Sequence, residues 1–417
     1  VFELLQSFNS NFTDTEFNEF LTKLHEILLQ DNRIIQTKSF FELFQRQNIN
    51  EYLIEYVFCE RQIKFPIHNS NFALIFKLLL SLMNSHFFIK YYSECGFIIS
   101  FIQNIQQFDI NVSNDGLCVI NRIISFLDKN KIMEIITPEI FDYLVSIIPT
   151  EVEFVNLITS FSCLFCSLIS KIDVLEIDLI NSILMKLLVV FEAEQSELYF
   201  HSISRILLVL LERGFDVRQF KTQYFKKLNR CYNFGGIDGK ITIFSIYEII
   251  INQSNSKFSY FVFNQHSAQL FDDLIEVPKR RESILKLILT FIKKDSSHID
   301  IILNSHLLDI VLRIQDDLSF SCIELVSQII DILVNNNYSD QPNIIKIVLK
   351  MLSFDQDGII RHVFDLINTI CSFMDKRGRL NEIKEEFCAC DGFDILNDLA
   401  VEYEEAHNIL QAFGLIE

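Results

Sequence analysis

Two cysteine pairs have the spacing that metal centres and redox couples use. Cys163 and Cys166 are separated by two residues in the run CLFC, and Cys388 and Cys390 by one residue in the run CAC. A structural zinc site needs four ligands, so a second pair or nearby histidines would be required. The CLFC run lies in an apolar segment without such partners. We therefore interpret both pairs as structural thiols and predict no metal site.

The run GGIDGK at residues 235–240 has some of the residues of a phosphate-binding loop. It lacks the spacing G-x-x-x-x-G-K-[ST] and a preceding parallel strand, so we interpret it as a turn. The patterns H-E-x-x-H and G-x-S-x-G and the EF-hand loop do not occur in the sequence. No pairing of nucleophile and base can be argued from it. We predict that the protein is not an enzyme and binds neither a cofactor nor a small-molecule substrate.

The composition favours helices joined by short polar loops. Five prolines and ten glycines are few for 417 residues, of which half are hydrophobic. An all-β chain would need turn residues about every 8–12 positions. The ten cysteines mostly lie among Leu, Ile and Phe. A chain of this size needs no disulfides, so we predict reduced core thiols in a cytoplasmic or nuclear protein.

The net charge and the apolar runs limit the classes of partner. The formal charge is −19 at pH 7, which argues against nucleic acid because phosphates require clustered Lys and Arg. The charge allows a basic protein partner, although it equally fits a role in solubility alone. The longest uncharged run, residues 154–170, has 17 residues with four serines. It is too short and too polar for a membrane span, and we predict no membrane insertion.

An internal repeat decides the fold class. Nine amphipathic segments align by their apolar faces, and their centres recur every 38 to 44 residues. Most of them follow a shorter amphipathic segment, and the linkers carry breakers and polar residues. The centres are Leu79, Ile123, Leu164, Leu207, Ile250, Ile288, Ile329, Ile367 and Ile409.

A unit of roughly 40 residues with two or three helices is typical of armadillo and HEAT repeats. We predict an all-α, armadillo/HEAT-type right-handed α-solenoid of about nine to ten helical repeats. Residues 1–70 fit the period less well and are predicted to be irregular N-terminal helical repeats with an insertion near ERQIKFPIHNS. Residues 71–417 are predicted to be armadillo-like repeats that end in a capping repeat, in one continuous solenoid.

A polar residue lies two positions before each of the nine apolar centres, and the i, i+4 partner of that residue lies two positions after the centre. On helices that are otherwise apolar, such residues would form a stripe along one face of the array. We predict that the stripe lines the concave groove and binds a partner, while a stripe that merely faces solvent would also be polar. The candidate groove residues are Lys77, Asn121, Ser162, Arg205, Glu248, Asn252, Lys286, Ser327, Asp331, Asp365 and Thr369. The basic runs PKRRE (278–282) and DKRGR (375–379) are interpreted as solvated loops.

The C-terminal run CDGFDILNDLAVEYEEAHNILQAF, residues 390–413, resembles the last armadillo repeat of importin-α, the nuclear import adaptor. The resemblance implies a groove in which Trp faces stack on cargo lysines while Asn amides hold the cargo backbone. This sequence has no Trp, and among the equivalent i, i+4 pairs only Glu248 and Asn252 keep the Asn. We therefore expect a conventional Lys-rich import peptide to bind weakly or not at all.

These features predict a non-catalytic scaffold or adaptor that binds protein or extended peptide segments through the concave face of the solenoid. One specific version is a divergent importin-α-like nuclear transport adaptor. The alternative is an armadillo/HEAT regulatory or assembly scaffold in signalling or cytoskeletal complexes.

Overall fold

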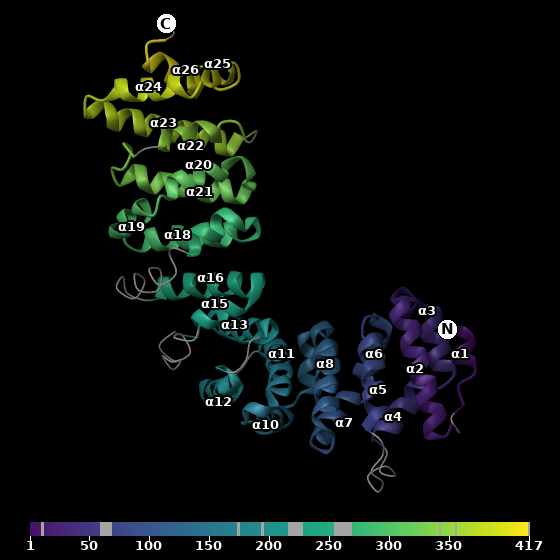
Figure 1. The fold of residues 1–417 in the computed structure, drawn as a ribbon. Helices are drawn as coiled ribbons and strands as arrows, with labels where there is room; N and C mark the ends of the chain where they lie inside the picture. Colours follow the sequence, from purple (N-terminus) through teal and green to yellow (C-terminus); the bar gives the residue numbers. More distant parts are fainter. Residues whose placement is uncertain are drawn as a thin grey trace. The chain divides into compact units, whose positions relative to one another are not determined.

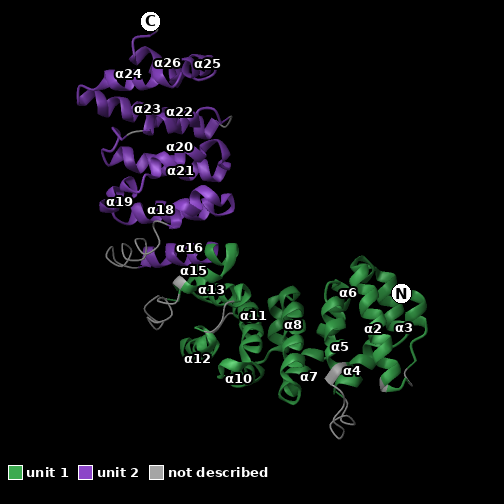
Figure 2. Cartoon of the chain, in the orientation of Figure 1, with its two compact units in different colours: residues 1–240 green, residues 241–417 purple. Residues whose placement is uncertain are grey.

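The computed structural model is helical throughout the residues that it describes. These are residues 1–9, 12–58, 69–172, 176–192, 196–215, 228–253, 269–341, 343–354 and 357–415, and within them there are α-helices and 3-10 helices but no strands. The chain forms two compact units, residues 1–240 and 241–417 (Figure 2). The insertion predicted near residues 60–70 lies largely outside the described residues.

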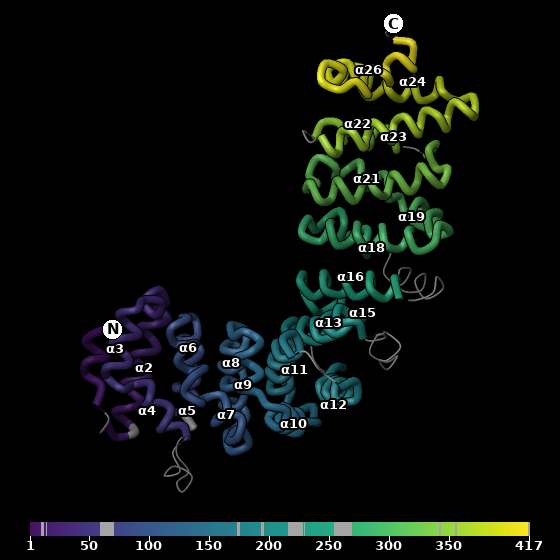
Figure 3. Tube along the Cα trace, turned by 180° about the vertical axis from the view of Figure 1, so that it is seen from behind, coloured from purple at the N-terminus to yellow at the C-terminus, as the bar shows by residue number. Residues whose placement is uncertain are grey.

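Unit 1 is a stack of long helices, each accompanied by shorter ones (Figure 1; Figure 3 from behind). The long helices α2, α5, α8, α11 and α13 each pack against the next in sequence order. The helices of unit 1 are α1 (Phe2–Gln6), α2 (Asp14–Gln30), η1 (Asn32–Gln36), α3 (Lys38–Arg46), α4 (Ile49–Phe58), α5 (Asn69–Leu82), α6 (His86–Glu94), α7 (Phe97–Asn104), η3 (Ile105–Gln107), α8 (Ile110–Phe126), α9 (Lys129–Ile135), α10 (Pro138–Ser146), η4 (Val152–Phe154), α11 (Val155–Lys171), α12 (Ile177–Leu187), η5 (Leu188–Val190), α13 (Glu197–Glu212) and α15 (Leu228–Phe234).

Unit 2 repeats the same arrangement, in which α18 packs on α21, α21 on α23, and α23 on α26. Helix α16 (Gly236–Gln253) includes the boundary between the units. Residues 269–276 are also helical, and the other helices are η7 (Pro278–Arg280), α18 (Arg281–Lys294), η8 (Ser296–His298), α19 (Ile299–Asn304), α20 (Leu307–Ile314), η9 (Gln315–Asp317), α21 (Phe320–Asn335), α22 (Ile344–Met351), α23 (Asp357–Lys376), α24 (Leu380–Ala389), α25 (Gly392–Leu399) and α26 (Glu404–Ala412).

The predicted apolar centres all lie in the core of this stack. They fall on α5, α8, α11, α13, α16, α18, α21, α23 and α26, and none of the nine exposes more than 2% of its surface. A helix pair cannot bury its apolar face alone, so each pair depends on its neighbours in the stack. The prediction of an all-α solenoid built from repeats of roughly 40 residues is confirmed.

The long helices within each unit run parallel, with their ends aligned by cations. The Lys171 ammonium at the end of α11 donates to the Ile124 and Leu127 carbonyls at the end of α8, both at 2.7 Å. Arg122 likewise donates to the Leu80 carbonyl of α5 at 2.8 Å, and Lys294 of α18 to the Asn252 carbonyl of α16 at 2.9 Å. The last carbonyls of a helix lack partners within it and carry partial negative charge. In these pairs the later helix thus caps the helix before it.

The C-terminal hairpin of α25 and α26 packs on α23 and α24, as expected of a capping repeat. Gly392 begins α25, and a Cβ there would lie 2.7 Å from Leu349 Cδ1 and 2.9 Å from Phe387 Cδ1. The absence of a Cβ at this position allows close packing against the Leu349 side chain of α22 and the Phe387 side chain of α24. On the other side, Glu402 and Glu404 are exposed, as a cap that faces water requires.

Two sequence interpretations are wrong. In GGIDGK only Gly235 lies between helices, and Gly236–Lys240 form the first residues of α16. In PKRRE the guanidinium groups are buried rather than solvated, because Arg280 is 7% and Arg281 5% exposed. Arg280 pairs with Asp273 at 2.7 Å. Such burial depends on neighbouring repeats, which a local run of charges does not reveal.

Helix α11 also has the composition of a membrane span. Residues 152–171 are long and apolar enough to cross a bilayer, judged only by length and hydropathy, and half of that stretch is buried within the fold. In unit 1 the helix packs between α8 and α13. A core helix of a helical repeat meets the same criteria.

Candidate functional site

The predicted groove residues differ in exposure. The side chains of Asn121, Glu248 and Asp331 are half-buried. Ser162 and Ser327 are buried, at 0% and 5% exposure. The remaining side chains are exposed, and they are Lys77, Arg205, Asn252, Lys286, Asp365 and Thr369.

Ser162 and Ser327 are therefore not part of an exposed stripe, and their prediction as groove residues is wrong. The Ser162 hydroxyl donates to the Ile158 carbonyl at 2.9 Å, and the Ser327 hydroxyl to the Glu324 carbonyl at 2.8 Å. A serine that satisfies its hydroxyl on its own helix can be buried without an unpaired donor. On α21 the exposed face is displaced by one residue and includes Gln328 in place of Ser327.

In unit 1 the polar residues of the long helices bond to one another across repeats. The Ser167 hydroxyl of α11 donates to Asn121 Oδ1 of α8 at 2.7 Å. Ser160 of α11 donates to Asn114 Oδ1 at the same distance. The predicted groove residue Asn121 therefore helps to join α8 to α11.

The thiols of this region follow the same pattern. Cys163 Sγ lies 3.2 Å from Ser202 Oγ of α13, and burial raises the pKa of the Cys163 thiol to about 11. Burial also raises the pKa of Cys166, opposed by the charge and hydrogen bond of Arg205. Thiolates are thus disfavoured where a metal or redox site would need them. Across the described residues, His, Cys, Asp and Glu form no group of three or more able to hold a metal ion.

The expectation of core thiols holds for only some cysteines. Cys231 and Cys322 are buried, whereas Cys95 and Cys388 are exposed and the other described cysteines are intermediate. The CAC run lies at the end of α24, where the helix surface meets solvent. Cys59 lies outside the described residues.

The exposed cations of the unit 1 stripe lie among other titratable groups. Burial lowers the pKa of His25 on α2, and the positive charge of Lys77 lowers it further. Burial raises the pKa of Asp115 on α8, and Lys77 opposes this rise. Burial, and then the charge of Arg205, lower the pKa of His201. Lys77 and Arg205 are thus placed within an electrostatic network of their own unit.

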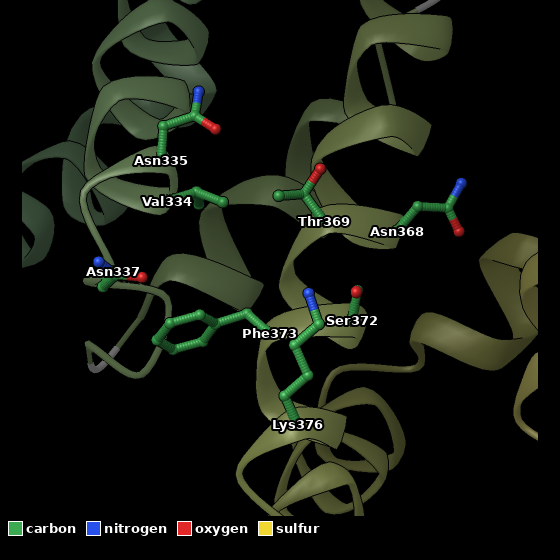
Figure 4. A pocket seen from close by; sticks show the side chains of 8 residues that line it. All are labelled: Val334, Asn335, Asn337, Asn368, Thr369, Ser372, Phe373 and Lys376. Atoms are coloured by element: carbon green, nitrogen blue, oxygen red, sulfur yellow. The ribbon is translucent and has the colours of Figure 1, made fainter.

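Unit 2 contains an open polar pocket between α21 and α23. Its volume is about 440 Å³, and most of the residues around it come from the C-terminal end of α21 and from the second half of α23 (Figure 4). The lining residues are Val334, Asn335, Asn337, Asn368, Thr369, Ser372, Phe373 and Lys376. The volume is within the range of pockets that hold small ligands or parts of a peptide.

One predicted groove residue lines this pocket, and two others bond to residues that line it. Thr369 lines it directly. Asp331 accepts a hydrogen bond at 3.0 Å from Nδ2 of Asn335, which is another lining residue. Asp365 lies one turn before Thr369 and receives the Thr369 hydroxyl on its carbonyl at 2.8 Å. Thr369 is thus the predicted residue that the structure places in the pocket, while Asp331 and Asp365 lie one turn from lining residues on α21 and α23.

The pocket offers polar groups with no protein partner. Among the described residues, no hydrogen bond is made by the side chains of Asn368, Ser372 or Lys376. In Figure 4 the Lys376 side chain extends along α23 toward Ser372. The Phe373 ring is covered by Arg377, whose guanidinium carbon lies 4.1 Å from the ring centroid. An amide, a hydroxyl and an ammonium are therefore available beside an aromatic ring.

Sequence reasoning missed Asn335, Asn368, Ser372 and Lys376. The stripe was predicted as one i, i+4 pair per repeat, whereas the exposed face of a helix is wide enough to include the i+3 positions. On α23 that face also includes Asn368 and Ser372, which are both exposed. Asn337 has another reason to be Asn, because its φ of 71° is left-handed at the end of α21.

Comparisons with known proteins bear on the fold alone. No family model matches the chain, and no curated protein matches it. A crystal structure of an engineered protein superposes with a TM-score of 0.58 and 13% sequence identity, covering 98% of this chain and 97% of the other. A crystal structure of importin beta gives a TM-score of 0.45 and 11% identity, covering 95% of this chain and 58% of that protein.

The first similarity supports a shared fold, and the second is too loose to support an argument. The chain is a helical-repeat solenoid. The resemblance of residues 390–413 to importin-α stays a prediction.

Proposed function

We propose that this protein is a non-catalytic scaffold that binds an extended segment of a partner protein on the exposed face of α21 and α23. The proposal depends on one observation, which is the open pocket lined by Asn335, Asn368, Thr369 and Ser372. Helical arrays commonly use such exposed faces to bind extended partners. We place this activity in the cytoplasm or the nucleus.

The chemistry of the pocket suits a peptide main chain. An extended peptide has one donor and one acceptor at nearly every residue. A carboxamide such as that of Asn368 can donate to a carbonyl and accept from an N–H at the same time. The hydroxyl of Ser372 can also donate and accept. The Phe373 ring lines the same pocket, with the Arg377 guanidinium over one of its faces.

The test is a selection from a random library of 15-residue peptides displayed on phage, with the whole chain as bait. Selected peptides are then synthesised and titrated against the double variant Asn368→Ala/Ser372→Ala. The control is Asn397→Ala/Asn408→Ala, which removes two exposed amides of α25 and α26. We expect binding to weaken about tenfold in the pocket variant, since each lost hydrogen bond contributes about 0.5–1.5 kcal/mol. A selection that yields no binder, or binders unaffected by the pocket variant, argues against the proposal.

The two finer versions of this function differ in the peptides that they require. A nuclear transport adaptor of the importin-α kind would bind a conventional Lys-rich import peptide. Without Trp each stacking site loses about 0.5–2 kcal/mol, so we favour the regulatory or assembly scaffold. Low-micromolar binding of such a peptide by calorimetry would reverse this preference.

A further inference from the structure

Unit 1 exposes a row of apolar residues where its long helices begin. Ile110 is the first residue of α8 and is 46% exposed. Val152 begins η4, just before α11, and is 50% exposed, while Leu198 is the second residue of α13 and is 56% exposed. These helices are parallel neighbours, so their N-terminal ends lie along one edge of the unit. Each residue is an aliphatic side chain that the fold leaves in water.

A small apolar pocket opens beside Ile110 on this edge. Its volume is about 120 Å³, and its walls come from η3 and α8 on one side and from α11 and Ile147, the residue after α10, on the other. Phe161 is 1% exposed and Ile105 4% exposed, so the interior is part of the core. A dry cavity of about 150 Å³ accepts benzene. A pocket of this size suits one branched aliphatic side chain.

The charged residues at the helix starts along this edge are acidic. Asp109, Glu151, Glu153 and Glu197 lie on the starts of the same three helices. Asp109 has a structural role, because its carboxylate accepts the Val112 N–H at 2.9 Å as the N-cap of α8. Glu151 precedes η4 but makes no such capping bond, so capping does not explain its charge.

The cations near this edge do not neutralise it. Lys186 at the end of α12 donates to the Val145 and Ser146 carbonyls, at 2.7 and 3.1 Å. His201 on α13 is held toward its neutral form, because burial lowers its pKa. Over residues 104–118, 146–161 and 196–203 the structure describes no Lys or Arg. We call Asp109, Ile110, Glu151, Val152, Glu153 and Glu197 the acidic edge.

We propose that the acidic edge is a second binding site, which takes a protein segment with one aliphatic side chain flanked by Lys or Arg. The aliphatic side chain enters the pocket beside Ile110, and the flanking cations face Glu151 and Glu153. Protein interfaces commonly have a buried apolar anchor at their centre and a polar or charged rim around it. An anionic lipid surface would be repelled by the same carboxylates.

The probes are three fluorescein-labelled peptides titrated against the whole chain by fluorescence anisotropy. Their core sequences are KKLKK, KKGKK and EELEE. We expect KKLKK to bind at least about tenfold more tightly than KKGKK, which lacks the anchor, and EELEE not to bind. Affinity should fall as salt is raised, because the rim charges are exposed to solvent. Equal affinity for KKLKK and KKGKK, or no saturable binding of KKLKK up to about 1 mM, overturns the proposal.

Matched variants locate the binding. Ile110→Gln should weaken KKLKK about tenfold, and Glu151→Gln/Glu153→Gln should weaken it and reduce its salt dependence. The controls are Phe320→Gln, which changes the exposed first residue of α21, and Glu402→Gln/Glu404→Gln on the terminal cap. Thermal melting checks that each variant folds, and Val152→Gln replaces Ile110→Gln if the latter is unstable. If the controls weaken binding as much as the edge variants, or if Ile110→Gln only abolishes self-association of the chain, the assignment is wrong.

Discussion

Replacing Arg281 with Met should destabilise unit 2 strongly, although PKRRE looks like an exposed basic loop. Arg281 is the first residue of α18, where a cation is disfavoured by the helix dipole. Its guanidinium nevertheless donates to the Leu274 carbonyl at 3.1 Å, to the Ile275 carbonyl at 3.3 Å and to the Asp317 carbonyl at 3.1 Å. One side chain therefore joins three segments of the chain.

The magnitude follows from two opposing effects. Each hydrogen bond from a charged donor contributes about 1.5–3 kcal/mol, and a buried carbonyl left without a partner costs about 1–3 kcal/mol. Removing a buried charge also recovers its desolvation cost, which is several kcal/mol. The Met side chain keeps most of the apolar contacts of the Arg stem. We expect a net loss of about 2–4 kcal/mol in the free energy of unfolding of unit 2.

Urea unfolding followed by circular dichroism, with hydrogen exchange of α18 and α21, measures the effect. At about 2–3 kcal/mol per M of urea, the transition of unit 2 should shift by about 0.7–2 M. The control is Lys279→Met in the same run, because Lys279 is exposed and such changes stay within about 0.5 kcal/mol. Equal shifts for the two variants would refute the reasoning that Arg281 acts by bonding to buried carbonyls.

Three further outcomes are expected. Lys171→Met should increase hydrogen exchange at the end of α8 and destabilise unit 1 by about 1–2 kcal/mol, because Lys171 donates to three carbonyls there. The control Lys131→Met removes only a surface pair with Glu134 and should change little. Iodoacetamide at pH 8 should label the exposed Cys388 before Cys163 and Cys371, as measured by mass spectrometry. Burial raises the pKa of Cys163 to about 11 and that of Cys371 to about 12. At pH 8 about 0.1% or less of each of these two thiols is therefore thiolate, the reactive form. Gly392→Ala should lower the melting temperature and reduce the free energy of unfolding by about 1–3 kcal/mol, because the new Cβ would lie 2.7 Å from Leu349 Cδ1. The control Gly358→Ala should not lower the melting temperature, since no atom lies within 4 Å of a Cβ at that position.

The repeat and its core could be predicted from sequence because they depend on apolar spacing alone. An Ile or Leu at the middle of a long apolar face, such as Leu164 or Ile288, is buried between the neighbouring helices. The spacing of these centres, together with the chain length, then gives the number of repeats. The same reasoning explains why the terminal hairpin needs a layer beneath it.

The candidate site was less predictable because polarity does not fix exposure. Ser162 and Arg281 are both polar and both buried, one bonded to its own helix and the other to two different segments. The pocket needs Asn335 and Asn368 from separate helices. Their meeting depends on how α21 and α23 pack, and no single helix pattern contains that information.

The state of the polar side chains also distinguishes the exposed faces of the two units. In unit 1, Asn121 bonds to Ser167, and the pKa of His201 responds to Arg205, so these residues serve contacts within the unit. In unit 2, Asn368 and Ser372 are exposed beside a pocket and have no hydrogen-bond partner in the described chain. A partner that bonds to Asn121 must compete with its existing hydrogen bond to Ser167. A partner that bonds to Asn368 or Ser372 displaces only water. A bound segment therefore gains most at the pocket between α21 and α23, which is where the search for a partner should begin.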